Sequence, residues 1–179
     1  MLELSNDVRS IAIPSIATQV VIGRYLKRLE RGDLTRDEDP ASHYCAYFLP
    51  YNEKTKNVLI IHHKKSGLWL SPGGHIDKDE RLLEALKREV FEELGVKDIV
   101  DETFKPFLLT ITPVNKTPHL CKEHFDIWFR IPTSEENLNI DFQEFHDAKW
   151  LTPEEAGKIV TDGPNLEALE KMKQLFAKG

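Results

Sequence analysis

The segment from Gly74 to Val96 constrains the fold more than any other part of the chain. After two glycines, apolar residues recur at helical spacing, which predicts one amphipathic helix over about 79–94. Gly95 stands where helices commonly end with a left-handed glycine. The apolar stripe has to be buried, so we expect this helix to pack against a sheet. The stripe consists of Leu82, Leu83, Leu86, Val90 and Leu94.

The same segment concentrates carboxylates. Residues 77–93 contain seven acidic and four basic side chains, so they carry −3, half of the formal net charge of −6. Glu92 and Glu93 follow Glu89 at i+3 and i+4, and the three therefore lie within about one turn of each other. Carboxylates this close repel one another, and oxygen clusters of this kind bind Mg²⁺ or Mn²⁺.

A solvated acidic face is the simpler interpretation, because Arg88 can pair with Glu84 and Glu92 at i,i+4. The preceding turn, Pro72-Gly73-Gly74, favours a metal site instead. Its glycines allow a tight bend and a close approach of the backbone to a ligand. A backbone carbonyl can then join the carboxylates around a cation.

These residues resemble the Nudix box. That pattern is a Gly, five residues, a Glu, seven residues, and then Arg-Glu, an aliphatic, any residue, Glu-Glu, any residue, Gly and an aliphatic. Gly74, Glu80 and the run Arg88-Glu89-Val90-Phe91-Glu92-Glu93-Leu94-Gly95-Val96 match every fixed position. With each residue type at roughly 5–10% of average usage, chance agreement at so many positions is negligible. Family-like context extends from about Tyr44 to Ala156.

The resemblance implies a hydrolase of a nucleoside diphosphate linked to another group, with an α/β/α sandwich around a mixed sheet. Its implied cofactor is Mg²⁺, with Mn²⁺ as a substitute, and Arg88 and Glu80 would orient the glutamates. The helix supplies cation ligands without a covalent nucleophile, so we expect direct attack of water on phosphorus. The implied metal ligands are Glu89, Glu92, Glu93 and the carbonyl of Gly74.

Further candidates for metal or substrate binding lie outside the helix that carries these glutamates. Glu144 precedes the strand-like Trp150 by six residues. Some relatives resemble this arrangement, with an additional glutamate there that binds metal or acts as the base. The alternative is an ordinary loop acid. Lys64 follows a predicted strand and is a candidate, with the adjacent Lys65 as its alternative, to meet a substrate phosphate; a solvated turn is the simpler interpretation. His75 follows the glycines, and His124 precedes an apolar strand; both are candidates for substrate binding.

A zinc site is an alternative for the run His119-Leu120-Cys121-Lys122-Glu123-His124. Its spacing is not a recognised four-ligand pattern, and the sequence shows no partner cluster. We therefore interpret this run as a solvated strand edge.

The remaining pattern predicts an α/β (α+β) fold, with a mixed sheet between helices and an N-terminal helical extension. A helix is expected over 15–31 with Ser15 as its cap, a helix start at Thr152-Pro153, and a last helix capped by Asn165. We expect residues 1–40 to be the extension, packed on a hydrolase domain that spans 41–179. Strands are expected at 44–49, 58–61, 104–114, 123–131 and 149–151.

The composition bounds the partners. A chain of 179 residues suits a single domain. Its net charge of −6 argues against a nucleic acid polymer and is compatible with a small nucleotide or nucleotide-like diphosphate, whose charge a metal offsets. Cys45 and Cys121 fit no metal spacing and are expected to be reduced thiols of a cytoplasmic protein. The acidic N-terminus is unlike a signal peptide, and the uncharged stretch 10–23 is too short to span a bilayer, so no membrane association is expected.

The leading hypothesis is a Mg²⁺-dependent pyrophosphohydrolase acting on a nucleoside triphosphate, a nucleotide sugar or a dinucleotide. A catalytically silent nucleotide sensor is the first alternative, although silent relatives usually lose box glutamates. An isoprenoid diphosphate isomerase on the same fold is the second alternative. Enzymes of that kind carry a Cys just before a Gly-His pair, and residues 72–75 have no Cys at that place. The leading helix could serve a homodimer.

Overall fold

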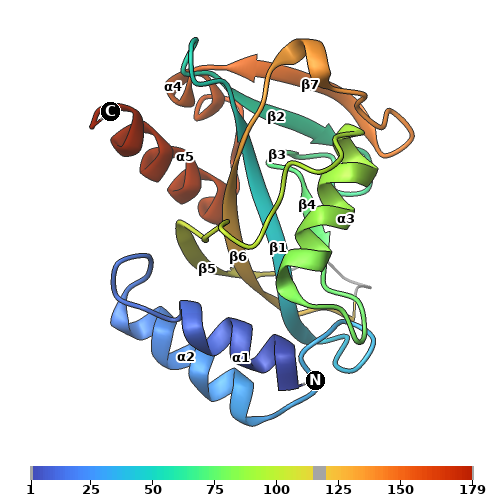
Figure 1. The fold of residues 1–179 in the computed structure, drawn as a ribbon, viewed down its shortest axis with the longest axis vertical. Coiled ribbons are helices and arrows are strands. Elements are labelled where there is room, and N and C mark those ends of the chain that lie inside the picture. The colour runs from blue at the N-terminus through green and yellow to red at the C-terminus, as the bar shows by residue number, and fades with distance from the viewer. Residues whose placement is uncertain (1, 115–119, 179) are drawn as a thin grey trace.

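A mixed sheet with helices on both sides forms the centre of the computed structural model, which describes residues 2–114 and 120–178 (Figure 1). The main strand order is β3-β2-β1-β6-β5, while β4 pairs with β1 and β7 pairs with β2. β1 and β6 are parallel, and the other pairs are antiparallel. The strands are β1 (Ser42–Tyr51), β2 (Val58–His63), β3 (Trp69–Leu70), β4 (Gly73–His75), β5 (Leu108–Pro113), β6 (Glu123–Pro132) and β7 (Phe145–Leu151).

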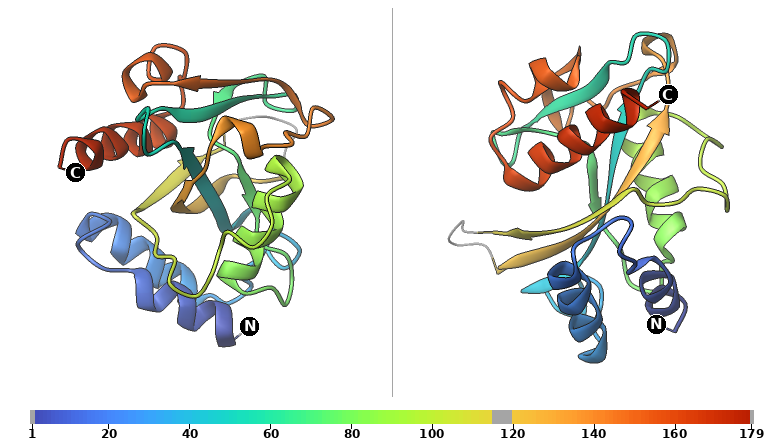
Figure 2. Two further views of the ribbon diagram at one scale, coloured as in Figure 1. Left: turned by 45° about the horizontal axis from the view of Figure 1, so that its top comes forward. Right: turned by 90° about the vertical axis from the view of Figure 1, so that its left-hand side faces the viewer.

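Helices cover the two faces of this sheet. α3 (Leu82–Leu94) lies on one side and α5 (Gly163–Phe176) on the other, as the right-hand view of Figure 2 shows. α4 (Pro153–Ala156) packs beside α5, and the short 3₁₀-helix η1 (Glu135–Asn137) follows β6. The predicted α/β/α sandwich around a mixed sheet is therefore confirmed. No helix in the described part of the chain combines the length and apolar character needed to cross a bilayer.

The first two helices share the main core. α1 (Leu2–Ile11) and α2 (Gln19–Glu30) lie together at one end of the sheet (Figure 1). Val8 and Tyr25 are fully buried, and the Tyr25 hydroxyl donates to the carbonyl oxygens of Thr110 at 2.9 Å and Asp126 at 2.6 Å. One core runs from these helices into the sheet, so packing does not mark a boundary between them. The division at residue 40 stays a prediction.

The strand predictions are confirmed with shifted ends, and the N-terminal helix prediction was wrong in its bounds. The helix expected over 15–31 begins at Gln19, and its cap is Thr18, whose Oγ1 accepts a hydrogen bond from Val21 N at 3.3 Å. Ser15 lies in a turn after Pro14. α1 was not predicted, because its buried residues are few and are separated by polar ones.

The cap of the last helix was also wrongly assigned. Asp162 caps α5, and its Oδ2 accepts a hydrogen bond from Asn165 N at 3.1 Å. Asn165 instead lies buried in the first turn, where its Oδ1 accepts from Ser71 N at 2.7 Å. Both side chain types cap helices well, so local sequence could not distinguish them.

Candidate active site

One cavity of about 490 Å³ gathers the carboxylates singled out above. α3 contributes Glu89, Glu92 and Glu93, and the loop before β7 contributes Glu144. Gly73 and Gly74 of β4 form part of the same wall. The fold thus brings residues from three separate segments around one space.

The glycine turn and the helix fit closely against each other. Gly73 N donates a hydrogen bond to Glu93 Oε2 at 2.7 Å. Gly73 has φ 132, and a Cβ there would meet the carbonyl oxygen of Ala46 at 2.5 Å. A Cβ on Gly74 would collide with the carboxylate of Glu89. The two glycines therefore allow β4 to lie directly against the glutamates, as a site that combines carbonyl and carboxylate ligands requires.

Arg88 connects the surrounding carboxylates. Its Nε and one terminal nitrogen each lie 2.9 Å from an oxygen of Glu80. The other terminal nitrogen donates to Glu89 at 2.7 Å and to Glu92 at 3.1 Å. These contacts, led by the hydrogen bonds with Glu80, raise the pKa of Arg88. The guanidinium thus fixes the direction of two site glutamates.

Negative charge exceeds positive charge in the buried part of the site. Burial raises the pKa of Glu89 to about 7 and raises the pKa of Glu93 well above its usual range. Repulsion by Glu89, and to a smaller extent by Glu144 and Glu92, adds to the rise in the pKa of Glu93. Arg88 is the only cation hydrogen-bonded to Glu89 among the described residues. A hard divalent cation fits this donor set, because buried carboxylates need a compensating charge and oxygen is its preferred ligand.

Comparison with known proteins now decides the family. A model of the NUDIX domain matches residues 41–174. The chain belongs to the Nudix hydrolase family. The m7GpppN-mRNA hydrolase NUDT17 of Xenopus laevis is 30% identical over 125 residues, which cover 59% of this chain and 40% of that protein. The nucleoside triphosphatase NudI of Salmonella schwarzengrund is 34% identical over 94 residues, which cover 50% of this chain and 64% of that protein.

The chain therefore spans less than two thirds of the length of these curated relatives. Among solved structures, the Escherichia coli dihydroneopterin triphosphate pyrophosphohydrolase has the same fold with a TM-score of 0.57. It is 22% identical, and the match covers 76% of this chain and 96% of that one.

Two of the three predicted substrate-binding residues line the cavity, and the third does not. His75 and His124 line the cavity. Lys64 does not; its Nζ donates to the carbonyl oxygens of Phe142 at 2.6 Å and Gln143 at 3.1 Å. The neighbouring Lys65 lines the cavity in its place. The two lysines are adjacent in a turn, so no sequence pattern could have told which one faces the site.

Sequence reasoning missed several other cavity residues. Arg36 lies in the loop between α2 and β1, and Tyr47 lies opposite Gly73 in the pairing of β1 with β4. Arg36 reaches the cavity from a loop that is distant in sequence, and Tyr47 reaches it through strand pairing, so local sequence offered no signal for either. The remaining lining residues that were not predicted are His63, Ser66, Leu70 and Asp77.

The interpretation of residues 119–124 as a solvated strand edge was wrong for His124, whereas Leu120 and Lys122 are exposed as expected. His119 lies outside the described residues. His124 belongs to β6, which is an interior strand between β1 and β5. Its ring packs against those of His43 and His75, with centroid distances of 5.0 and 5.2 Å. Burial is the main reason why the pKa falls to about 4 at His124 and to about 3 at His75.

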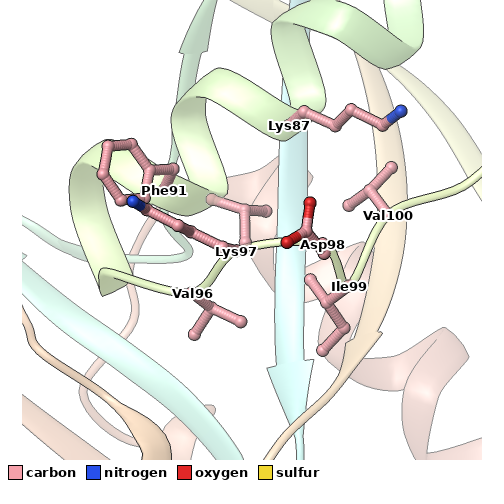
Figure 3. A pocket seen from close by; sticks show the side chains of 8 residues that line it. Lys87, Phe91, Val96, Lys97, Asp98, Ile99 and Val100 are labelled. Carbon is pink, nitrogen blue, oxygen red and sulfur yellow. The ribbon is translucent and has the colours of Figure 1, made fainter.

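A second hollow, of about 390 Å³, lies at the C-terminal end of α3 (Figure 3). Four of its eight lining residues are aliphatic, and Lys97 Nζ lies 4.8 Å from the centroid of the exposed Phe91 ring. Asp98 is the one carboxylate in that wall. The described residues of this wall thus form no cluster of metal ligands, whereas Glu89, Glu92 and Glu93 line the first cavity.

Proposed function

We propose that this chain is a Mg²⁺-dependent pyrophosphohydrolase that cleaves a phosphoanhydride bond of a small nucleotide: a nucleoside triphosphate, a nucleotide sugar or a dinucleotide. One observation carries the proposal. Glu89, Glu92, Glu93 and Glu144 line the same cavity as the Gly73-Gly74 turn, and Glu89 and Glu93 are buried.

The residues of the box have distinct proposed roles. Glu89, Glu92, Glu93 and the Gly74 carbonyl hold the cation, for which Mn²⁺ can substitute. Divalent cations bound there would neutralise the diphosphate and lower the pKa of water. Arg88 keeps Glu89 and Glu92 in position, and Glu80 keeps Arg88 in position, through the contacts described above.

Hydrolysis proceeds by direct attack of water on phosphorus. A cavity carboxylate removes a proton from the water, whose oxygen forms the new bond to phosphorus while the bridging P–O bond breaks. The leaving phosphate takes the electron pair of that bond. Glu144 lies in the cavity close enough to Glu93 to raise the pKa of that residue, which supports a role for Glu144 as a metal ligand or as the base.

The size and lining of the cavity support a small substrate. Its volume of about 490 Å³ falls in the usual range of small-molecule sites, about 300–1,000 Å³. Arg36 and Lys65 supply positive charge for phosphates, and Tyr47 supplies an aromatic ring. His75 and His124 complete the wall. The net charge of −6 speaks against a polymeric nucleic acid substrate.

A substrate panel tests this proposal. Nucleoside triphosphates, nucleotide sugars and dinucleotides are incubated with the chain and Mg²⁺ or Mn²⁺, and phosphate is measured after a coupling phosphatase. We expect metal-dependent release that a chelator abolishes. Reaction in ¹⁸O-water should label one phosphate product, because water itself attacks phosphorus.

Matched variants locate the chemistry. Glu92→Gln and Glu93→Gln should each lower kcat by about 10³-fold or more, as expected when a group that stabilises transition-state charge is lost. Glu84→Gln, on the same helix but outside the cavity, should retain the wild-type rate. Unchanged turnover in the first two variants would refute the assignment. Calorimetric binding of a nucleotide without any product would favour a sensor instead. The homodimer and the cytoplasmic location stay predictions.

A further inference from the structure

Three neighbouring strands bring three histidines and one cysteine to one face of the sheet. His43 and Cys45 are two residues apart on β1, so their side chains point to the same side. His124 of β6 is the register partner of His43, and His75 of β4 is the register partner of Cys45. The cluster is therefore built by strand pairing and not by a mobile loop.

The four side chains are close enough to share one ion. Each offers one ligand atom, and these atoms all lie within 4.8 Å of one another. A tetrahedral zinc ion, with Zn–N bonds of about 2.0–2.1 Å and Zn–S bonds of about 2.3 Å, places its ligands about 3.3–3.6 Å apart. Small rotations of the side chains supply the remaining contraction of roughly 1 Å.

The orientation of His43 suits ligation. Its Nδ1 lies 3.0 Å from the carbonyl oxygen of Asp39, which can only accept a hydrogen bond, so Nδ1 carries the proton. Nε2 is then the nitrogen with a free lone pair. Histidine ligands of metals typically donate their other N–H to a backbone carbonyl or a carboxylate in this way.

A buried carboxylate with an unpaired oxygen lies beside the cluster. Asp126 follows His124 by two residues and is the register partner of Cys45. Its Oδ2 accepts hydrogen bonds from the hydroxyls of Thr110 and Thr112, whereas its Oδ1 has no hydrogen-bond partner within the described residues. A zinc ion with one thiolate and three neutral imidazoles carries a net positive charge, which this carboxylate would balance.

We propose that His43, Cys45, His75 and His124 form a second metal site, which binds one Zn²⁺ ion with four protein ligands. Thiolate and imidazole ligands select Zn²⁺ over Mg²⁺, which prefers oxygen. Four protein ligands close the coordination shell, as in structural zinc sites. The ion joins β1, β4 and β6 next to the cavity, and it is distinct from the cation held by the glutamates.

Arg36 lies against one ligand of this site. Its side chain is exposed, and one terminal nitrogen lies 3.4 Å from His75 Nδ1. A bound cation repels this guanidinium, so Arg36 has to swing away when the ion enters. Removing the arginine, in Arg36→Ala, should therefore tighten zinc binding several-fold.

Metal titration of the full chain, stripped with a chelator, tests the proposal independently of hydrolysis. Excess Mg²⁺ is kept present to occupy the glutamates. We expect one equivalent of Zn²⁺ to bind and to raise Tm. Co²⁺ in place of Zn²⁺ should give the intense visible bands of a tetrahedral site and a near-ultraviolet thiolate-to-cobalt charge-transfer band.

The two cysteines provide a matched pair of variants. Cys45→Ser should abolish the charge-transfer band and weaken zinc binding by at least about 100-fold, the upper end of the loss that follows removal of mere supporting partners. Cys121→Ser should retain both, although Cys121 Sγ lies 4.0 Å from His43 Nε2. His75→Ala, at the cavity wall, provides a second test in which the core is left intact, and it should lose the tetrahedral bands.

Three results would overturn the proposal. The first is the absence of tetrahedral cobalt bands in the wild-type chain. The second is zinc binding that survives in both Cys45→Ser and His75→Ala. The third is a band that depends on Cys121 instead of Cys45. Because Mg²⁺-dependent hydrolysis is measured separately with the glutamate variants, failure of the zinc site and failure of the proposed hydrolase activity give different results.

Discussion

Arg88 and Glu80 form a two-pronged ion pair in which both carboxylate oxygens accept a hydrogen bond, each at 2.9 Å. Glu80 belongs to the loop before α3, and the same carboxylate also accepts from Asp77 N at 3.0 Å. The pair therefore ties the loop to the guanidinium that positions Glu89. Glu80→Gln should lower kcat by about 10–100-fold with little change in KM, the loss typical of a residue that orients a metal ligand.

Steady-state kinetics with a substrate from the panel measures this effect. Asp79→Asn is the control, since Asp79 is an exposed carboxylate of the same loop with φ 66, a conformation that Asn also adopts. It should leave kcat unchanged. A Glu80→Gln enzyme with wild-type kcat would show that the other carboxylates hold Arg88 without help from Glu80.

Asp7 of the N-terminal helix caps the helix that carries the glutamates. Its Oδ2 accepts from Leu82 N at 3.4 Å, and its Oδ1 pairs with Arg81 at 3.2 Å. Loss of a helix cap costs about 1 kcal/mol, or about 2–4 °C in Tm for a chain of this size. Asp7→Ala should show that loss with unchanged kcat, because the glutamates lie at the other end of α3. Asn6→Ala, at an exposed position of the same helix, is the thermal-melt control; an equal shift in both variants would argue against capping.

Replacing Gly73 by alanine should lower stability, whereas replacing Gly74 by alanine should lower kcat. At Gly73, φ 132 and contact with the β1 backbone leave no room for a Cβ, so Gly73→Ala should cost about 1–3 kcal/mol of stability. At Gly74 the three atoms nearest to the added Cβ all belong to the carboxylate of Glu89, the end of a side chain that can rotate away. Gly74→Ala should therefore fold normally yet lose about 100-fold in kcat through displacement of that carboxylate. Denaturant melts and kinetics on both variants distinguish the two effects.

The sequence predicted the parts of the fold and site that local patterns encode. The apolar stripe of α3, its end at Gly95 and the spacing of Glu89, Glu92 and Glu93 depend on residues within a few turns of each other. The caps of α2 and α5 were misassigned, because several Ser, Thr, Asp and Asn residues near each start are equally good caps. Only tertiary contacts, such as Asn165 with Ser71, decide between them.

Residues that meet through strand pairing were beyond sequence reasoning. His124 showed no partners because His43 and His75 lie far from it in the chain and approach it only through the pairing of β1 with β6 and β4. The sequence around Asp126 likewise did not predict that this carboxylate would be buried beside Cys45. A spacing rule for metal ligands detects neighbours in sequence, whereas this cluster depends on register across three strands.

Lys64 and Lys65 should affect different kinetic constants although they are adjacent. Lys65 lines the cavity, so Lys65→Ala should raise KM by about 10-fold or more, the cost of losing one charge-assisted contact with a phosphate. Lys64 instead holds the carbonyl oxygens of Phe142 and Gln143, and its backbone N donates to the carbonyl oxygen of Glu144 at 3.0 Å. Lys64→Ala keeps the backbone bond but removes the two Nζ contacts, which loosens the loop that carries Glu144 and should lower kcat while KM changes little. Saturation curves for both variants check this separation, and a rise in KM for Lys64→Ala alone would show that Lys64 reaches the substrate after all.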